Sequence, residues 1–359
     1  MLKQQSLDFL KRLLATISPS GFEEEAAAVW MNEAKPFADR VYGDLHGNAF
    51  AVVNQGGKPK VMLAGHIDEI GLMITHIDDE GYLYFRGIGG WDPQILQGQW
   101  IWIRTRTGRV PGVIGKKPVH LLKEEDRTKA LKLEELWIDI GAKDKAEASS
   151  LVSIGDPAVL AYGFETLRND LAISRGFDDK CGAFVVLEAA RLLAELNPQA
   201  EIYAVATSQE EIGLRGAQTS AYGIDPKVGI AVDVGFASDF PTMGDQKKQL
   251  GEATVGKGPM IARGANVNPK FFDLLIETAQ GQKIPYQISP IPAGTGTDAN
   301  AMQLTRSGVA TSLISIPNRY MHSPCELVSL NDLENAARLI AHSVEQITEK
   351  MDFIPVRPA

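Results

Sequence analysis

Hydrophobic positions in the first part of the chain recur with the period of a helix and then gather into a short apolar run. Over residues 3–16, apolar residues are interleaved with charged ones at helical spacing, which predicts an amphipathic helix. Ser20 and Glu23 have the spacing of a capping box, which predicts that a second helix begins there. The following segment "KPKVMLAGHIDEIGLMI" is typical of a short buried strand that runs into polar residues.

The pattern changes in the middle of the chain. Residues 69–165 contain mostly short strand patterns, separated by turn signals such as "DDEG" and "RTGRVPG", and helical periodicity is weak there. Within this part, residues 120–150 are highly charged, and we interpret them as a solvated surface or assembly segment. The pattern therefore predicts a β-rich insert.

From residue 166 onward, helical patterns alternate with apolar strands. A helix is expected over residues 181–196 and another over "LNDLENAARLIAHSVEQITEK", and the expected strands are "IYAVATS", "VGIAVDV" and "ATSLISI". Such alternation predicts βαβ units on a largely parallel sheet sandwiched by helices. We therefore expect an α/β domain that consists of residues 1–68 and 166–359 and is interrupted by the insert.

The composition is that of an ordinary globular protein, with 359 residues of which 44% are hydrophobic and 23% charged. The formal charge of −9 argues against a nucleic-acid or membrane partner, because both require clustered lysine and arginine. The N-terminal segment lacks the apolar region of a signal peptide and no stretch has transmembrane length, so we expect a cytoplasmic protein. Cys181 and Cys325 cannot form a disulfide framework; we interpret them as small buried apolar residues, with a soft-metal or redox role as the alternative.

Polar residues of the kinds that bind metals follow four of the expected strands and precede one helix. The carboxyl ends of parallel strands share one edge of a sheet, and ligands bind at this edge in open α/β folds. Each residue alone has a simpler explanation, such as a structural histidine, a helix N-cap or a solvated carboxylate, but the set at one edge predicts a common site. The residues are His66 and Asp68 after the first strand, Asp178 and Asp179 before the helix, and Glu210, Glu211, Asp233 and His322 after the later strands.

Divalent metals explain this combination of residues. Three carboxylates and two imidazoles in one pocket would repel one another or be protonated without a cation, whereas two divalent cations reverse that balance. Two metals about 3.5–4 Å apart hydrolyse amides in aminopeptidases. Alternate residues of an extended segment face the same way, so Asp68 can orient His66. Adjacent residues point oppositely, so Glu210 and Glu211 are expected to divide metal binding and proton transfer between them.

The motifs "GHIDEIG", "GFDDKCG", "SQEEIGLRGA", "AVDVGFASD", "GTGTDANAMQ" and "NRYMHSPCE" occur in order over nearly the whole chain. Together they resemble the tetrahedral, glutamyl and deblocking aminopeptidases, a family of cocatalytic dimetal metallopeptidases of which some members were once labelled cellulases. The resemblance implies a zinc-exopeptidase-like fold with residues 69–165 as a β-barrel-like dimerisation domain. It also implies dimers that assemble into a tetrahedral dodecamer.

The same resemblance implies a role for each residue of the predicted site. It implies two divalent ions per subunit, which share one bridging carboxylate, and a cis peptide bond after that bridging residue. His66 and Asp233 would bind one metal, Glu211 and His322 the other, and Asp178 both, while Glu210 would be the general base and acid and Asp68 would orient its neighbours.

Candidate substrate-binding residues lie in two further segments. In "IPAGTGTDANAMQ", Thr297 and Asp298 lie where a helix N-terminus would offer backbone donors. In "PNRY", Arg319 would meet an acidic substrate group or belong to an ion pair. His46, His76, His120 and His342 have no motif that supports them as ligands. Nitrogen and oxygen ligands accept several divalent ions, so zinc, cobalt and manganese all stay open.

The predicted function is a metal-dependent aminopeptidase that releases N-terminal residues from short peptides. A dimetal carboxypeptidase or deacylase is the alternative with the same chemistry. A glycoside hydrolase would also use paired carboxylates, but these stand at least about 5 Å apart across a sugar and need no metal ligands. A noncatalytic scaffold would have no reason to keep Glu210 together with every ligand.

Overall fold

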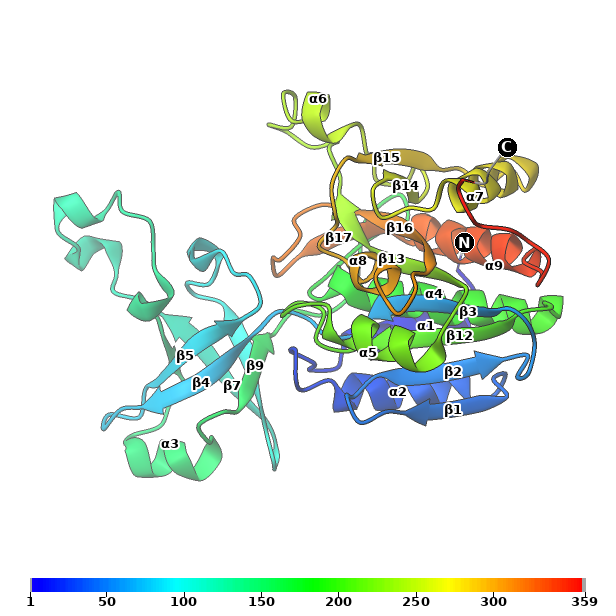
Figure 1. The fold of residues 1–359 in the computed structure, drawn as a ribbon. Helices are drawn as coiled ribbons and strands as arrows, with labels where there is room; N and C mark the ends of the chain where they lie inside the picture. Colours follow the sequence, from blue (N-terminus) through cyan, green and yellow to red (C-terminus); the bar gives the residue numbers. More distant parts are fainter. Residues whose placement is uncertain (1, 357–359) are drawn as a thin grey trace.

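The computed structural model describes residues 2–356 and has two lobes of different size (Figure 1). The larger lobe is built from the beginning and the end of the chain, around a central sheet. The smaller lobe is built from the middle of the chain and lies to one side of the larger lobe. The chain thus leaves the larger lobe once and returns to it.

The sheet of the larger lobe is mixed and mainly parallel. Its strand order is β1-β2-β12-β3-β13-β16-β14-β15. The central strands β12, β3, β13 and β16 pair in parallel, whereas β2 and β14 pair antiparallel with this central group, so the central carboxyl ends share one edge. The strands are β1 (Arg40–Gly43), β2 (Ala49–Val53), β12 (Glu201–Thr207), β3 (Lys60–His66), β13 (Val228–Phe236), β16 (Ala310–Asn318), β14 (Met260–Gly264) and β15 (Gln287–Ile291).

Helices cover both faces of this sheet, so its strands are apolar on both sides. Along β3, Val61 and Leu63 join one hydrophobic cluster, whereas Met62 and Ala64 join the cluster on the opposite face. Strands buried on both faces have continuous apolar sequences, as "VMLA" does. The first face packs against α1 (Gln4–Leu14), α2 (Glu24–Ala34), α4 (Phe177–Leu196), α7 (Pro269–Gly281) and α9 (Leu330–Glu345), and the second against α5 (Arg215–Ile224) and α8 (Asp298–Gln303).

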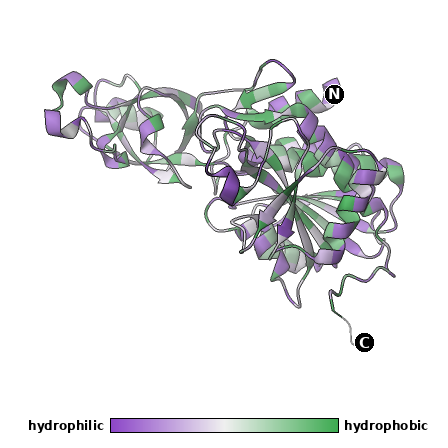
Figure 2. Cartoon of the chain, turned by 90° about the horizontal axis from the view of Figure 1, so that it is seen from above, coloured by the Kyte–Doolittle hydropathy of each residue, from purple (hydrophilic) through white to green (hydrophobic). Residues whose placement is uncertain are grey.

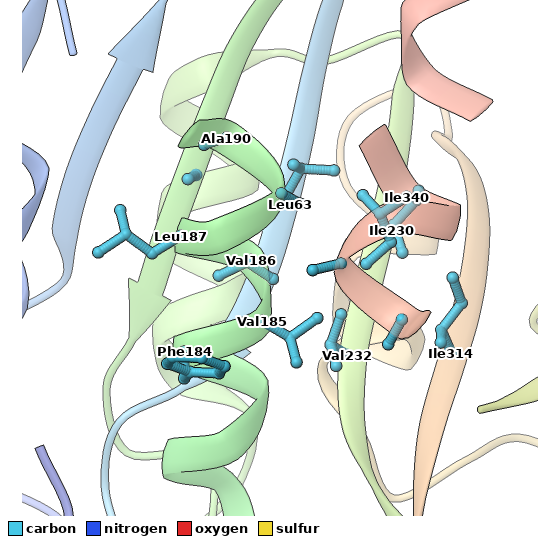
Figure 3. Packing of buried hydrophobic residues seen from close by; sticks show 14 of the residues in the cluster. Leu63, Phe184, Val185, Val186, Leu187, Ala190, Ile230, Val232, Ile314 and Ile340 are labelled. Carbon is cyan, nitrogen blue, oxygen red and sulfur yellow. The ribbon is translucent and has the colours of Figure 1, made fainter. Parts of the chain in front are cut away.

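Helix α4 lies in the centre of the larger cluster. Figure 3 shows its side chains beside Leu63 of β3, Ile230 of β13 and Ile340 of α9, all of which are buried. Full burial of such a side chain contributes about 1.5–3 kcal/mol. Figure 2 shows hydrophobic and hydrophilic residues mixed on the surrounding helices, as expected for amphipathic helices with one face in the core. The packing fixes the N-terminus of α4 at the carboxyl edge of the sheet.

The fold class predicted from the sequence is confirmed, but the predicted capping box is wrong. Helix α2 begins at Glu24 without a side-chain cap. The Ser20 hydroxyl instead donates to Oδ2 of Asp68 at 2.6 Å, and Oε1 of Glu23 accepts from the backbone amides of Gly21 and Gln209. Both side chains therefore attach the entry of the helix to loops at the carboxyl edge of the sheet.

The smaller lobe contains a closed barrel with the strand order β4-β5-β8-β7-β6-β9. Its buried side chains form a cluster of their own, which includes Leu72, Phe85, Ile103 and Ile138. This barrel is the predicted β-rich insert, while its exact boundaries and its role in dimerisation stay predictions. The strands are β4 (Gly71–Ile77), β5 (Leu83–Ile88), β8 (Trp137–Asp139), β7 (Gly108–Gly115), β6 (Trp100–Thr105) and β9 (Pro157–Leu160).

The interpretation of residues 120–150 as a solvated surface or assembly segment is wrong for strand β8, whereas helix α3 (Lys145–Leu151) is exposed except at Ala148. Trp137–Asp139 forms the barrel strand β8, in which Ile138 is buried. Lys145–Leu151 forms the helix α3, and the Asp144 side chain caps this helix by accepting from the backbone amide of Glu147 at 2.9 Å. Short elements make up the rest: the sheet β10 (Glu165–Thr166), β11 (Leu171–Ser174) and β17 (Glu326–Ser329), the helix α6 (Lys247–Leu250), and the 3-10 helices η1 (Pro93–Ile95), η2 (Val119–Leu121), η3 (Glu124–Asp126) and η4 (Leu133–Glu135).

Within residues 2–356, no helix combines the length and the apolar character that crossing a membrane requires.

Candidate functional site

The parallel strands bring the predicted ligands to one edge of the sheet. His66 is the last residue of β3, and Asp233 lies near the end of β13. Glu210 and Glu211 follow β12, and His322 follows β16. Asp178 lies at the start of α4, whose N-terminus the core holds at the same edge.

These side chains form two groups that share one carboxylate. Within each group of three, the potential ligand atoms all lie within 4.8 Å of one another. Asp178 belongs to both groups: its Oδ1 is 3.2 Å from Nε2 of His66, and its Oδ2 is 3.3 Å from Nε2 of His322. The two oxygens of Asp178 thus face two different imidazoles, as expected of a bridging carboxylate. The groups are His66, Asp178 and Asp233, and Asp178, Glu211 and His322.

The adjacent residues Glu210 and Glu211 face different halves of the site. Oε2 of Glu210 lies 3.7 Å from Nε2 of His66, whereas Oε1 of Glu211 lies 3.4 Å from Nε2 of His322. Among the described residues, Glu211 belongs to a ligand group and Glu210 belongs to none. The geometry therefore separates the two carboxylates in the way that divided roles require.

Asp68 connects the His66 imidazole with the loop that carries Glu210 and Glu211, mainly through backbone groups. Its carboxylate accepts the backbone amides of Glu210 at 3.0 Å and of Glu211 at 3.2 Å, in addition to the Ser20 hydroxyl. Nδ1 of His66 lies 3.5 Å from Oδ1 of Asp68 but only 3.1 Å from the carbonyl oxygen of Asp68. Asp68 thus lies beside the imidazole as the sequence predicts, but its carboxylate primarily holds the glutamate loop.

The electrostatics of the site show an excess of buried carboxylates. Burial raises the pKa of Glu210 to about 10, and Asp233 and Asp298 add to this shift. Burial likewise raises the pKa of Asp233. The neighbouring carboxylates of Asp178 and Glu211 raise the pKa of His322 to about 11. The carboxylates therefore compete for the few positive charges that the described residues supply.

Divalent cations fit this arrangement. Oε1 of Glu211 is buried and accepts no hydrogen bond from any residue that the structure describes. Positive charge between the two groups would favour the ionised carboxylates and lower their pKa values. Imidazole nitrogens and carboxylate oxygens are suitable ligands for zinc, cobalt and manganese.

A sequence profile of the M42 glutamyl aminopeptidases matches residues 47–339 of the chain. The chain belongs to the M42 family. Its sequence is 40% identical over 351 residues to the lysyl aminopeptidase of Pyrococcus furiosus, a match that covers 97% of this chain and 99% of the relative. The M42 chain is thus an aminopeptidase, and the predictions of its family and enzyme class are confirmed.

Solved structures of M42 relatives have the same fold. The TET aminopeptidase of a marine sediment archaeon of the Thaumarchaeota is 36% identical, with a TM-score of 0.90 over 96% of both chains. The TET1 peptidase of Pyrococcus horikoshii is 32% identical, with a TM-score of 0.85 over 95% of this chain and all of that chain, and it assembles into a tetrahedron or a large octahedral shell.

The predicted substrate-binding residues of the M42 chain have protein partners of their own. Asp298 is buried and accepts a hydrogen bond from the Thr207 hydroxyl. Oγ1 of Thr297, the residue before α8, lies 2.9 Å from Oγ1 of Thr295. Nε and Nη2 of Arg319 donate to the two carboxylate oxygens of Asp239, so Arg319 belongs to the ion pair that the sequence left open. A role of Thr297, Asp298 and Arg319 in substrate binding stays a prediction.

Sequence reasoning missed several residues that surround the ligands of this M42 site. The Glu326 carboxylate accepts the backbone amides of Asp178 and His322. From the insert, Gly89 and Gly90 approach the site: a Cβ atom at Gly89 would lie 3.5 Å from Oε2 of Glu211, and one at Gly90 would lie 3.8 Å from Nδ1 of His322. The motif that ends in Glu326 and the glycine pair in "GIGGW" were the available signals.

Other expectations about this part of the M42 chain have mixed outcomes. The peptide bond between Asp178 and Asp179 is cis, as the resemblance implied. Cys181 is fully buried, whereas Cys325 is partly exposed, so burial describes only the first of the two cysteines. Within residues 2–356, the two ligand groups contain no cysteine and no other histidine than His66 and His322.

Proposed function

We propose that this M42 aminopeptidase uses two divalent metal ions and a glutamate base to release N-terminal residues from short peptides. The observation that carries the proposal is the shared position of Asp178, whose two oxygens face the imidazoles of two separate ligand groups. His66, Asp178 and Asp233 would hold one ion, and Asp178, Glu211 and His322 the other. Zinc or cobalt are the proposed ions, and manganese is compatible with the same ligands.

The reaction would depend on the placement of Glu210. When bound, two divalent cations polarise a substrate carbonyl and acidify an attacking water. Oε2 of Glu210 would accept the proton of that water and return it to the leaving amine. Asp68 keeps Glu210 in place by accepting its backbone amide, and the same carboxylate anchors Glu211. Burial of these groups strengthens their electrostatic interactions.

The test of this function combines metal analysis with three related substrates. Purified protein should contain two divalent ions per chain and lose activity on chelation, and it should cleave a free-amine peptide and the C-amidated version but not the N-acetylated one. An active preparation without stoichiometric metal would contradict the metal mechanism. Cleavage that requires a free carboxyl terminus would favour the carboxypeptidase alternative, and activity only on the acetylated peptide would favour the deacylase.

We also propose that the barrel holds the chain in dimers and in a larger closed assembly, a tetrahedral dodecamer in the cytoplasm. The assembled Pyrococcus relative supports this proposal, and so do the exposed apolar side chains of the insert. These side chains are Tyr82, Tyr84, Trp100, Val113, Val119, Leu121, Leu151, Ile154 and Tyr162.

Trp100 offers a direct test of the assembly. It is 68% exposed and lies opposite the exposed Val113 on the neighbouring strand. Trp100→Glu should shift the mass measured by light scattering toward smaller species, whereas Leu45→Glu, a change at an exposed residue of the larger lobe, should leave it unchanged. A wild-type protein that is monomeric at working concentration and fully active would refute the assembly and leave the metal mechanism intact.

A further inference from the structure

We propose that Glu326 is a positioning residue. By accepting a hydrogen bond from the backbone amide of Asp178 and another from that of His322, it fixes these two residues relative to each other. The inference rests on the proposed metal centre, of which Asp178 and His322 are ligands. It assigns Glu326 no contact with substrate or metal.

The Glu326 carboxylate lies between the two ligand segments. Its Oε2 accepts the backbone amide of Asp178 at 2.8 Å, and its Oε1 accepts the backbone amide of His322 at 3.0 Å. The side chain is 2% exposed. Glu326 begins β17 and pairs there with Ser174 of β11, the strand that leads into Asp178. One buried carboxylate therefore joins two segments that are far apart in the sequence.

Both amides lie in irregular backbone and need such a partner. Asp178 has φ −77° and ψ 105°, which interrupts the helical conformation at the start of α4. His322 has a positive φ of 58° in the turn after β16. Neither amide belongs to the regular hydrogen-bond pattern of a helix or a sheet. A buried amide without an acceptor costs free energy, so each needs another acceptor. The two oxygens of Glu326 supply these acceptors, one to each amide, which makes the side chain a clamp between the two segments.

The clamp has unequal consequences for the two ligand groups. The group of Asp178, Glu211 and His322 contains both of the clamped residues, whereas the group of His66, Asp178 and Asp233 contains only one. In Glu326→Gln, the amide nitrogen would face one of the backbone donors, so one of the two hydrogen bonds would be lost. Metal binding should therefore weaken more in the first group than in the second.

Asp332 provides a matched control with the same local chemistry. It is 1% exposed, and its two oxygens accept the backbone amides of Gly256 at 2.7 Å and of Gly258 at 2.8 Å. These amides belong to the turn before β14 and not to the ligand segments. Asp332→Asn should thus lower stability by a comparable mechanism without changing the metal centre.

The experiment is a Zn²⁺ titration of wild type, Glu326→Gln and Asp332→Asn in competition with a chromophoric chelator. Loss of a hydrogen bond that orients a ligand commonly weakens metal binding about 10–100-fold. A loss of this size is expected for the weaker of the two Zn²⁺ binding steps in Glu326→Gln. Asp332→Asn should keep the wild-type affinities, although the apo forms of both variants should melt below the wild type. Two sites of wild-type affinity in Glu326→Gln, or an equal loss in Asp332→Asn, would overturn the positioning role.

The outcomes separate this inference from the proposed function. Fewer than two Zn²⁺ ions on the wild type would contradict the two-metal mechanism itself. If Glu326→Gln does not fold, Glu326→Asp replaces it, since the shorter side chain reaches at most one of the two amides. A folded Glu326→Asp with weakened Zn²⁺ binding supports the clamp, and one with wild-type binding rejects it.

Discussion

Asp68 and Glu69 are neighbours in the sequence, and Asp178 and Lys180 are nearly so, yet they belong to two different buried clusters of charge. In the first cluster Glu69 binds Lys180, whose Nζ lies 2.6 Å from Oε1, and also Arg175. Lys180 and Arg175 both donate to the carbonyl oxygen of Thr16 as well. Burial opposes ionisation of Glu69, but the two cations outweigh it and lower the pKa of Glu69.

In the second cluster, at the ligand edge, comparable burial is accompanied by the opposite net shift in pKa. There the carboxylates face one another and two imidazoles, and burial raises the pKa of Glu210 to about 10. The comparison shows that burial alone does not decide the charge of a carboxylate; its neighbours do. Lys180 and Arg175 neutralise the Glu69 carboxylate, whereas the carboxylates at the ligand edge would need bound cations to neutralise them.

The largest effect, on catalytic rate and metal content, should come from changes in the carboxylate cluster at the ligand edge. Glu210→Gln should retain metal and lower kcat about 10²–10⁴-fold, because general base catalysis contributes roughly that factor. Glu211→Gln should instead reduce the metal content, because Glu211 belongs to a ligand group. Elemental analysis and kcat of both variants check this, and an equal fall in metal content would contradict the division of roles.

In the Glu69 cluster, Lys180→Met should lower the free energy of unfolding. Removing one partner of a buried ion pair costs about 3–5 kcal/mol, and the lower end is expected here because Arg175 still faces Glu69. Lys145→Met, which breaks an exposed pair with Asp79, is the control and should cost at most about 1 kcal/mol. Urea unfolding measures both, and equal stability of the two variants would show that the buried cluster contributes little.

The smallest effect concerns how the contribution of the Glu69 cluster to stability depends on pH. The folded-state pKa of Glu69 is lowered, so its contribution to stability is present above the unfolded-state pKa, about 4.3, and is lost as the pH falls through the folded-state value. The difference in Tm between wild type and Glu69→Gln should therefore be largest near neutral pH and shrink in acid. A difference that grows on acidification would show that Glu69 has the opposite shift.

The ligand edge was predictable because its information is local. Parallel strands are recognisable as apolar runs, and the residues after them must meet at one edge, so His66, Asp233 and His322 could be grouped before their distances were known. The alternation of helices with these runs indicated the fold class in the same way. Motif resemblance supplied the roles, which spacing alone left open.

What the sequence did not reveal depends on contacts between distant segments. Ser20 and Glu23 have capping-box spacing, but their side chains bind Asp68 and Gln209 instead. The partner of Arg319, Asp239, lies 80 residues away, and no periodicity marks it. Strand β8 is three residues long inside a charged segment, and only its pairing with β5 and β7 completes the barrel.

The clamp formed by Glu326 has a consequence for the order in which the enzyme is made. It joins residues that are 148 positions apart, and His322 and Glu326 are among the last residues of the sheet lobe to be synthesised. When His66, Asp178 and both glutamates have emerged from the ribosome, the nascent chain still lacks His322 and also Glu326, which accepts the backbone amide of Asp178. Translation would therefore delay completion of the proposed site until nearly the whole polypeptide is available to fold.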